Sequence, residues 1–356
     1  MLEIADRGTA SQGLIWIYET AAADLPWRVT TAAMKATWLI VGVALATSGC
    51  EKDRGMPAAK GSGALSSSEA ELLAHLPAGG DMVFGGNYFG LQDWTANSPL
   101  GRMSKQIDPI SAKWNACLAR SNFTMAGAGS FRDGALRMAM YMKGIDLAGF
   151  GSCASDAGLP VTRDPDGKFM TVTLENRGGL TLAMPYLAVP GGVYTVVSLR
   201  LDPGTITPVA VDLGRADLER EQATLATTNL ANDPRMGAWL AKVDRSRTFF
   251  FVGSGEGSPW GDQVGLIYGG MDVSDGLAID VTVDVRADGG ADQVVSGWKR
   301  ARSELGRLPP SMQPLKDAMK SVRLGKTKDG LRVVARISNA QLEAVTAMIA
   351  PMLPQP

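Results

Sequence analysis

The sequence predicts an α+β fold built from two similar units, in which antiparallel β-hairpins pack with helices. The first observation is an Asp-Gly pair between two segments of alternating polarity, present at Asp133-Gly134 and again at Asp275-Gly276. The second is that helical stretches precede and follow each hairpin. The third is that the hairpin signature recurs about 140 residues later, which suggests an internal duplication.

The first unit, residues 69–214, is predicted to open with helices and to continue as strands. The expected helices are 66–75, 91–107 and 108–120, and the expected strands are 81–85, 123–129, 135–143, 168–174, 179–183 and 193–199. The turn before residue 168 contains Asp166 and Gly167, which are residue types that favour a tight reversal.

The second unit, residues 215–356, repeats this pattern. The expected helices are 216–230, 234–243 and a helix-rich stretch 291–320, and the expected strands are 248–252, 264–273, 277–285, 322–327 and 331–337. Prolines at 309, 310 and 314 break the long helical stretch. Ser338 and Gln341 stand at capping-box spacing before the last helix. That helix is expected to present one apolar side, made of Leu342, Val345, Met348, Ile349 and Met352.

Residues 34–49 have the composition of an export signal. Met34 and Lys35 form a short positive start, an apolar stretch of about eleven residues follows, and small residues precede Cys50. Because spanning a bilayer takes ~20 apolar residues, this stretch is too short for a transmembrane helix. Residues 1–33 carry acidic groups that such a signal would not tolerate well. We therefore expect translation to start at Met34 and residues 1–33 to be a mis-assigned upstream extension.

Ser48 and Gly49, directly before Cys50, resemble the lipobox of bacterial lipoproteins. The resemblance implies cleavage before Cys50, diacylation of its sulfur and attachment of the mature chain to a membrane of the cell envelope. Thr47 departs from the pattern, because the family usually has Leu there. Glu51 is not the Asp that tends to retain lipoproteins in the inner membrane, so the resemblance favours the outer membrane.

Residues 50–68 are rich in charge, Gly and Ser and show no apolar periodicity, so they are predicted to form a flexible tether. Two alternatives stay open for Cys50 and the preceding segment: a secretory signal without lipid, and a buried helix followed by a core thiol. The body after the tether resembles two-unit envelope lipoproteins of unknown function, and this resemblance implies no activity.

The residue counts exclude several classes of function. The 35 Lys and Arg residues nearly cancel the 36 Asp and Glu residues, which argues against nucleic acid as a partner. His75, expected at a helix end, is the single histidine, so imidazole-based catalysis and zinc sites with several histidines are nearly excluded. Cys117 and Cys153 form an even pair in an exported chain. We predict a disulfide between them, with two separate buried thiols as the alternative.

Met138, Met140 and Met142 alternate along one predicted strand, and thioethers at this spacing suit Cu(I). The same alternation is typical of the core face of a sheet, which is the interpretation we favour.

Asp272, Asp275 and Asp280 form an acidic cluster that suggests calcium or a pair of catalytic carboxylates. The calcium-loop pattern with a closing Glu is missing, so we favour a solvated turn.

Two short motifs are weaker still. The glycine-rich run 253–257 follows a strand but leads into Ser-Pro-Trp-Gly rather than a helix start, so we interpret it as a loop, and 127–129 leads into a hairpin. Ser296 and Lys299 match the serine–lysine spacing of penicillin-binding enzymes. The companion motifs are missing, so we interpret them as a chance pair on a helix surface.

These features predict a membrane-anchored envelope lipoprotein without enzymatic activity, which binds another envelope component or acts as a structural element. Two alternatives stay open. One is a hydrolase without histidine that acts on an envelope polymer, and the other is a periplasmic carrier of a solute or of copper. We predict no cofactor, no metal site and no catalytic residue.

Overall fold

The computed structural model describes residues 61–87, 90, 93–94, 97–132, 135–175, 181–201, 208–256 and 263–349. Residues 1–60, which include the predicted export signal and Cys50, lie outside the described residues. The first Asp-Gly turn, at Asp133 and Gly134, and Met352 of the predicted last helix also lie outside them.

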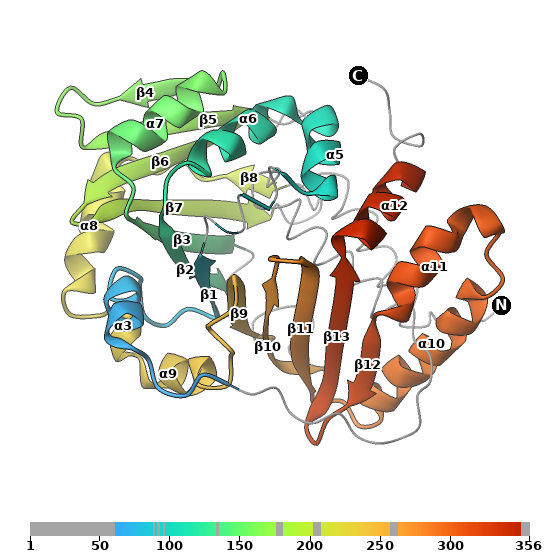
Figure 1. Cartoon of the computed structure of the whole chain (residues 1–356). Coiled ribbons are helices and arrows are strands. Elements are labelled where there is room, and N and C mark those ends of the chain that lie inside the picture. Colours follow the sequence, from blue (N-terminus) through green and yellow to red (C-terminus); the bar gives the residue numbers. More distant parts are fainter. Residues whose placement is uncertain are drawn as a thin grey trace, which may run out of the picture.

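The described strands form one antiparallel sheet of 13 strands, which confirms the predicted α+β class (Figure 1). In order along the sheet they are β12, β13, β11, β10, β9, β1, β2, β3, β7, β6, β5 and β4, with β8 paired to β7. Their bounds are β1 (Met82–Asn87), β2 (Thr124–Arg132), β3 (Ala135–Lys143), β4 (Val161–Arg163), β5 (Phe169–Glu175), β6 (Thr181–Val189), β7 (Gly192–Leu201), β8 (Pro208–Ala210), β9 (Phe249–Ser254), β10 (Val264–Asp272), β11 (Gly276–Val285), β12 (Arg323–Lys326) and β13 (Gly330–Ser338).

The strands run outward from the central pair β1·β9 in a matching order on both sides. On one side β2, β3, β7 and β6 follow, and on the other side β10, β11, β13 and β12 follow. Phe84 and Phe251 face each other in the central pair. The segments predicted as two units are therefore joined edge to edge in one continuous sheet, and the duplication of their sequence stays a prediction.

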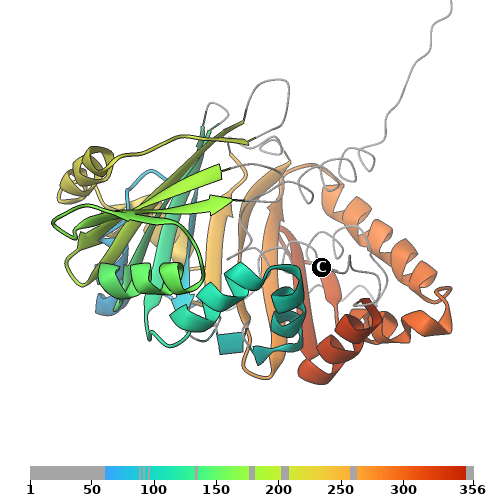
Figure 2. The ribbon, with the colours of Figure 1, turned by 90° about the horizontal axis from the view of Figure 1, so that it is seen from above.

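The described helices cover both faces of the sheet. The first face packs against α5 (Pro99–Ile107), α6 (Pro109–Leu118), α7 (Leu147–Asp156), α10 (Gly290–Leu305), α11 (Gln313–Lys320) and α12 (Asn339–Ile349), and the second face packs against α3 (Ser67–Leu73), α8 (Arg215–Leu225) and α9 (Pro234–Leu240). Two short 3₁₀ turns are η1 (Leu230–Asn232) and η2 (Pro310–Met312). Figure 2 shows α7, α6, α5 and α12 along one side of the sheet and α8 on the other.

The helix ends follow from local sequence. Ser66 and Glu69 form a capping box at the start of α3, and Ser338 and Gln341 form the predicted one before α12. Helix α7 was not predicted, because its glycines hide the helical pattern. Asp146 caps it by accepting a hydrogen bond from the backbone N–H of Gly149 at 2.6 Å.

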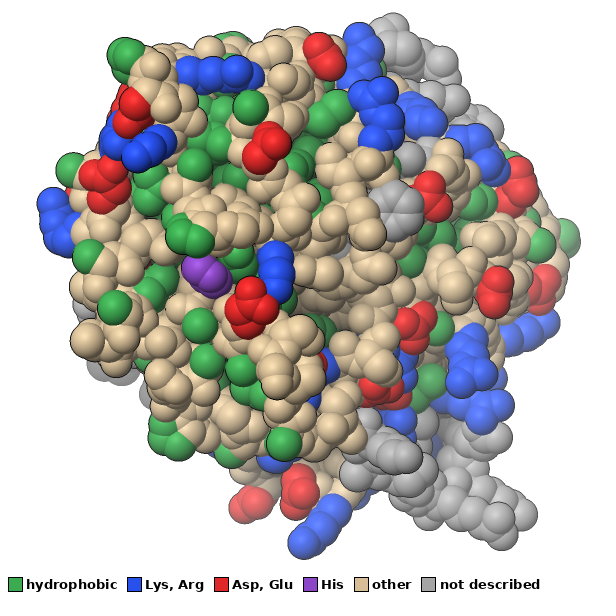
Figure 3. Space-filling model, turned by 60° about the vertical axis from the view of Figure 1, so that its left-hand side comes forward, with side chains coloured by type: hydrophobic (Ala, Val, Ile, Leu, Met, Phe, Trp, Pro, Cys, Tyr) green, Lys and Arg blue, Asp and Glu red, His purple; other side chains and the backbone are tan. Residues whose placement is uncertain are grey.

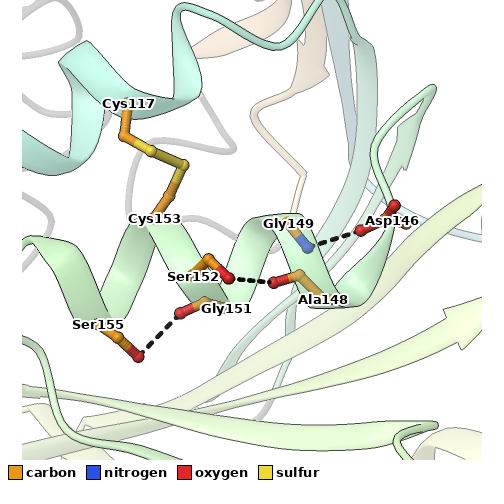
Figure 4. The surroundings of a disulfide bond; sticks show 8 residues. All are labelled: Cys117, Asp146, Ala148, Gly149, Gly151, Ser152, Cys153 and Ser155. Carbon is orange, nitrogen blue, oxygen red and sulfur yellow. Dashed lines mark hydrogen bonds between the residues drawn. A yellow bond between two sulfur atoms is a disulfide. The ribbon is translucent and has the colours of Figure 1, made fainter.

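The disulfide between Cys117 and Cys153 is present, as predicted, and it joins α6 to α7 (Figure 4). The two Cα atoms are 5.4 Å apart, which suits a disulfide. Trp114 of α6 also packs edge-on against Phe150 of α7, with ring centroids 5.5 Å apart. The crosslink therefore reinforces a packed helix pair on the first face.

The methionine row on β3 is buried in the first-face core, which confirms the core interpretation. Met138, Met140 and Met142 are each less than one-tenth exposed. Ala139 and Tyr141, which point to the second face, are equally buried, so both faces of this strand are covered. Because the thioethers do not face solvent, the row does not provide a surface copper site.

Candidate functional site

The predicted acidic cluster is divided by the sheet. Asp275 lies exposed in the β10–β11 turn, as the turn interpretation predicted. Asp272 ends β10, and Asp280 points to the second face from the middle of β11. Both are bound by basic side chains, so for these two residues the interpretation as a solvated turn is wrong.

Asp280 is the centre of a charged network on the second face. Arg332 of β13 donates from Nε to Oδ1 at 2.8 Å and from Nη2 to Oδ2 at 2.7 Å. Arg247 donates to the same Oδ2 at 3.2 Å. Such two-pronged pairing fixes the direction of a carboxylate as well as its charge. The hydrogen bonds with Asp280 raise the pKa of Arg332, which therefore stays cationic.

Arg247 extends this network to the start of β9. It donates to Oδ2 of Asp272 at 3.4 Å and lies 3.5 Å from a carboxylate oxygen of Asp244. Asp272 also accepts a hydrogen bond from the backbone N–H of Thr248 at 2.9 Å. The network therefore ties the loop before β9 to the end of β10 and to the middle of β11.

These charged positions differ from the matching positions in the other half of the sheet. In the pair β3·β7, Ala139 faces Val196, and both are buried in the core that α3, α8 and α9 cover. In the matching pair β11·β13, Asp280 faces Val334. The second face therefore changes along the sheet from an apolar core to a network of charged side chains.

A second charged pair lies nearby on β11. Burial raises the pKa of Asp284, and Lys242, whose Nζ is 3.9 Å from its carboxylate, opposes that shift. The same Nζ lies 5.7 Å from the ring centroid of Tyr268. Because Lys242 is about half exposed, water screens this pair and it contributes little to stability.

Arg245 holds the first described residues of the chain against the body. Its side chain is only 2% exposed and donates to Oε1 of Glu69 at 2.7 Å. It also donates to the backbone carbonyls of Gly63 at 3.1 Å and Ala64 at 2.8 Å. The described part of the predicted tether, 61–68, therefore lies on the body.

His75 lies at the surface just after α3, where it is the purple side chain of Figure 3. Its ring stacks on Tyr141, with centroids 4.0 Å apart. Burial lowers the pKa of His75, and the carboxylate of Glu71 opposes that shift. Glu71 itself pairs with Lys143 at 2.7 Å. The histidine is thus held by stacking beside an ion pair, which is a structural arrangement.

The two weak motifs lie apart from the network. Strand β9 ends at Ser254, and the backbone N–H of Gly255 donates to the carbonyl of Gly265, while 257–262 lie outside the described residues. Ser296 and Lys299 lie on α10, and Ser296 is exposed.

The chemistry of the network favours recognition or rigidity over catalysis. Both oxygens of Asp280 accept hydrogen bonds from arginines, so this carboxylate is engaged in ion pairs within the protein rather than open to a substrate. Sequence reasoning missed Arg245, Arg247 and Arg332. Only the register of β13 against β11, which places Arg332 beside Asp280, would have indicated the network.

Comparison with known proteins gives little further information. No protein-family model matches the chain, and no curated protein matches it. Among solved structures, the chain is similar to crystal form I of TP0453, with a TM-score of 0.37 and 10% identity over 80% of this chain and 98% of that chain. For crystal form III the TM-score is 0.36, with 11% identity over 78% and 97% of the two chains. The likeness is weak, and we draw no functional conclusion from it.

Within the part of the chain that the structure describes, no helix is long and apolar enough to cross a membrane. Within the same residues, no three His, Cys, Asp or Glu side chains lie close enough together to hold a metal ion.

Proposed function

We propose that the protein is an exported envelope lipoprotein, anchored by lipid on Cys50, with a binding or structural role and no enzymatic activity. The observation that carries this proposal is the disulfide between Cys117 and Cys153. Structural disulfides persist in oxidising compartments such as the bacterial periplasm and are rare in the cytosol. The disulfide and the export signal at 34–49 therefore support the same compartment from independent parts of the chain.

The way the chain joins the body also suits a tethered protein. Arg245 fixes residues 63 and 64, so the eleven residues 50–60 connect the lipidated cysteine to a rigid attachment point. A fully extended chain of this length reaches at most about 40 Å. The body would then stay near the membrane, and the absence of Asp after Cys50 favours the outer membrane.

The network around Asp280 supports a role in binding or structure. Its strong hydrogen-bond donors are Arg247 and Arg332, and both are already committed to carboxylates. His75 is stacked on Tyr141 and has no carboxylate orienting its ring as a catalytic base requires, among the interactions described for it. The contacts of the network and of His75 therefore lend no support to the hydrolase or to the carrier alternative.

The test is to express the full chain in a bacterial host and to determine the N-terminus of the membrane-bound product by mass spectrometry. We expect a mature chain that begins at Cys50 and carries a diacylglyceryl group and amide-linked acyl chains. Cys50→Ser should leave the leader attached. The matched control Ser48→Ala keeps a small residue before the cysteine and should be processed normally.

Two further measurements sharpen the test. A chain that starts at Met34 should be exported as well as the full chain, because residues 1–33 are expected to be dispensable. An unmodified thiol on Cys50, with the leader retained and the protein in the cytosol, would refute the proposal.

A further inference from the structure

The chain enters the body on the second face of the sheet. The backbone N–H of Ser62 donates to the carbonyl of Val243 at 2.9 Å, and Gly61 lies so close to Ala241 that a side chain would collide with its carbonyl. Lys242, next to that point, reaches over the ring of Tyr268 on β10. A lipid anchor upstream of Gly61 is therefore connected to the body on this face of the sheet.

Three arginines lie on the outer strands of the same face. Arg323 of β12 faces Val334 of β13, and Arg332 and Arg336 lie two residues to either side of Val334. Side chains at these positions share a face, and diagonal neighbours are about 7–8 Å apart. We call these three residues the arginine face.

Two of the three residues of the arginine face, Arg323 and Arg336, carry positive charge that no described ion pair compensates, whereas Arg332 is paired with Asp280. The acidic residues on this face of the neighbouring strand β11 have basic partners of their own, since Asp280 is shared by Arg332 and Arg247 and Asp284 lies 3.9 Å from Lys242. Arg323 and Arg336 are exposed, and no ion pair holds either of them within the described residues. On this side of β12 and β13, every charged strand residue is therefore basic.

We infer that the arginine face rests on an anionic lipid surface and orients the body on the membrane that holds its anchor. The inference rests on the proposed lipid anchor at Cys50. Clustered arginines are attracted to anionic headgroups, and such a patch together with a lipid chain holds a protein to a membrane in a defined way. The arginine face supplies the orientation, and the lipid supplies the attachment.

The geometry allows both contacts at once. Three strand spacings of about 4.8 Å separate β10, beside the entry point, from β12, so the arginine face lies about 14 Å from that point. The eleven residues 50–60 reach at most about 40 Å, which is ample for the anchor to insert beside the face. Because the interaction is electrostatic at an exposed surface, salt should weaken it.

The experiment uses the lipidated full chain reconstituted on vesicles of phosphatidylcholine alone or of phosphatidylcholine with phosphatidylglycerol. Arginines are labelled with phenylglyoxal, and each site is quantified by mass spectrometry. On anionic vesicles, labelling of Arg323 and Arg336 should fall about fivefold, and added salt should restore it. Arg120, an exposed arginine just after α6 on the opposite side of the sheet, should label equally on both vesicles.

A pair of variants tests the same inference without relying on arginine chemistry. Amide hydrogen exchange in β12, which carries Arg323, should slow on anionic vesicles. The double variant Arg323→Gln and Arg336→Gln should abolish that slowing, whereas Arg120→Gln should preserve it. The substituted residues are exposed, so both variants are expected to fold.

The possible outcomes distinguish a failure of the arginine face from a failure of the lipid anchor. Equal labelling of Arg323 and Arg336 on both kinds of vesicle would overturn the inference, and so would equal protection by inorganic phosphate without vesicles, because that would indicate a phosphate site. Mass spectrometry of Cys50 in the same sample separates the two proposals. If Cys50 carries no lipid, the anchor proposal fails. If it carries lipid and labelling is unchanged, only the arginine face fails.

Discussion

Substituting Arg245 by Met should destabilise the protein strongly, because this guanidinium is almost completely buried and fully bonded. The substitution removes the hydrogen bonds to Glu69 and to the backbone carbonyls of Gly63, Ala64 and Leu240. Breaking a buried ion pair by removing one partner costs ~3–5 kcal/mol. Glu69 retains 29% of its side-chain exposure, so water partly solvates the remaining carboxylate. We therefore expect a loss of about 3 kcal/mol, at the lower end of that range.

The pH dependence gives a second, independent measure. Burial raises the pKa of Glu69, but hydrogen bonds from Arg245 and Ser66 outweigh it and hold the pKa below its ordinary value near 4.5. A carboxylate with a lowered pKa stabilises the fold fully above that ordinary value, and the contribution is lost as the pH falls through the lowered one. The difference between the wild type and Arg245→Met should therefore be complete at pH 7 and should shrink below about pH 4.5.

The assay is equilibrium unfolding in urea, monitored by far-UV circular dichroism at several pH values. Arg220→Met is the matched control, because Arg220 is mostly exposed and, among the described residues, forms an ion pair with Asp217 alone, three residues earlier on α8. It should cost less than about 0.5 kcal/mol. If Arg245→Met also cost less than about 1 kcal/mol at pH 7, the hydrogen bonds of Arg245 would together contribute no more than one ordinary hydrogen bond, and the reasoning would fail.

Three further predictions concern the crosslink, the charged network and the histidine. Replacing both Cys117 and Cys153 by Ser opens a loop of 36 residues and should lower the free energy of unfolding by up to ~4 kcal/mol, measured by the same urea assay. Arg332→Met leaves Asp280 with Arg247 alone, so we expect a loss of about 2 kcal/mol, and adding Asp280→Asn to it should recover part of that loss. His75 should titrate below its ordinary pKa of 6.5 in an NMR experiment, where the single imidazole gives one set of signals. Because burial opposes charging of His75, its contribution to stability should be complete above about pH 6.5 and should be lost as the pH falls through its lowered pKa. A measured pKa above 6.5 would contradict this prediction.

The parts of the fold that depend on local sequence were predicted from the sequence. The Asp275-Gly276 turn joins β10 to β11, and Gly276 adopts a φ of 126°, a left-handed region that favours glycine. The capping box at Ser338 and the disulfide partner of Cys117 were also predicted correctly. Each of these features is decided by neighbouring residues or by a simple count, so it needs no knowledge of the tertiary structure.

Features that depend on pairing between strands far apart in the sequence were not predicted. Asp272 and Asp280 are far in the sequence from their partners, since Arg247 precedes Asp272 by 25 residues and Arg332 follows Asp280 by 52 residues. Only the register of β11 against β13 brings them together. The pairing of β1 with β9 was missed for the same reason, since nothing local indicates that the two halves share one sheet.

The difference between the two halves of the sheet explains why the charged network is a better candidate for function than the apolar core. Strands β3 and β11 occupy matching places in the sheet, yet Ala139 on β3 is buried under helices whereas Asp280 on β11 carries a charge on the same face. Burying an ion pair gives little net stability compared with well-packed apolar side chains, so stability alone does not favour Asp280 at this position. A requirement to present arginines on this face does account for it, because the carboxylate of Asp280 holds the guanidinium of Arg332 in a fixed direction. Replacing Asp280 by Asn frees Arg332 and removes a negative charge from this face, so binding to anionic vesicles should become stronger where the sheet stays folded.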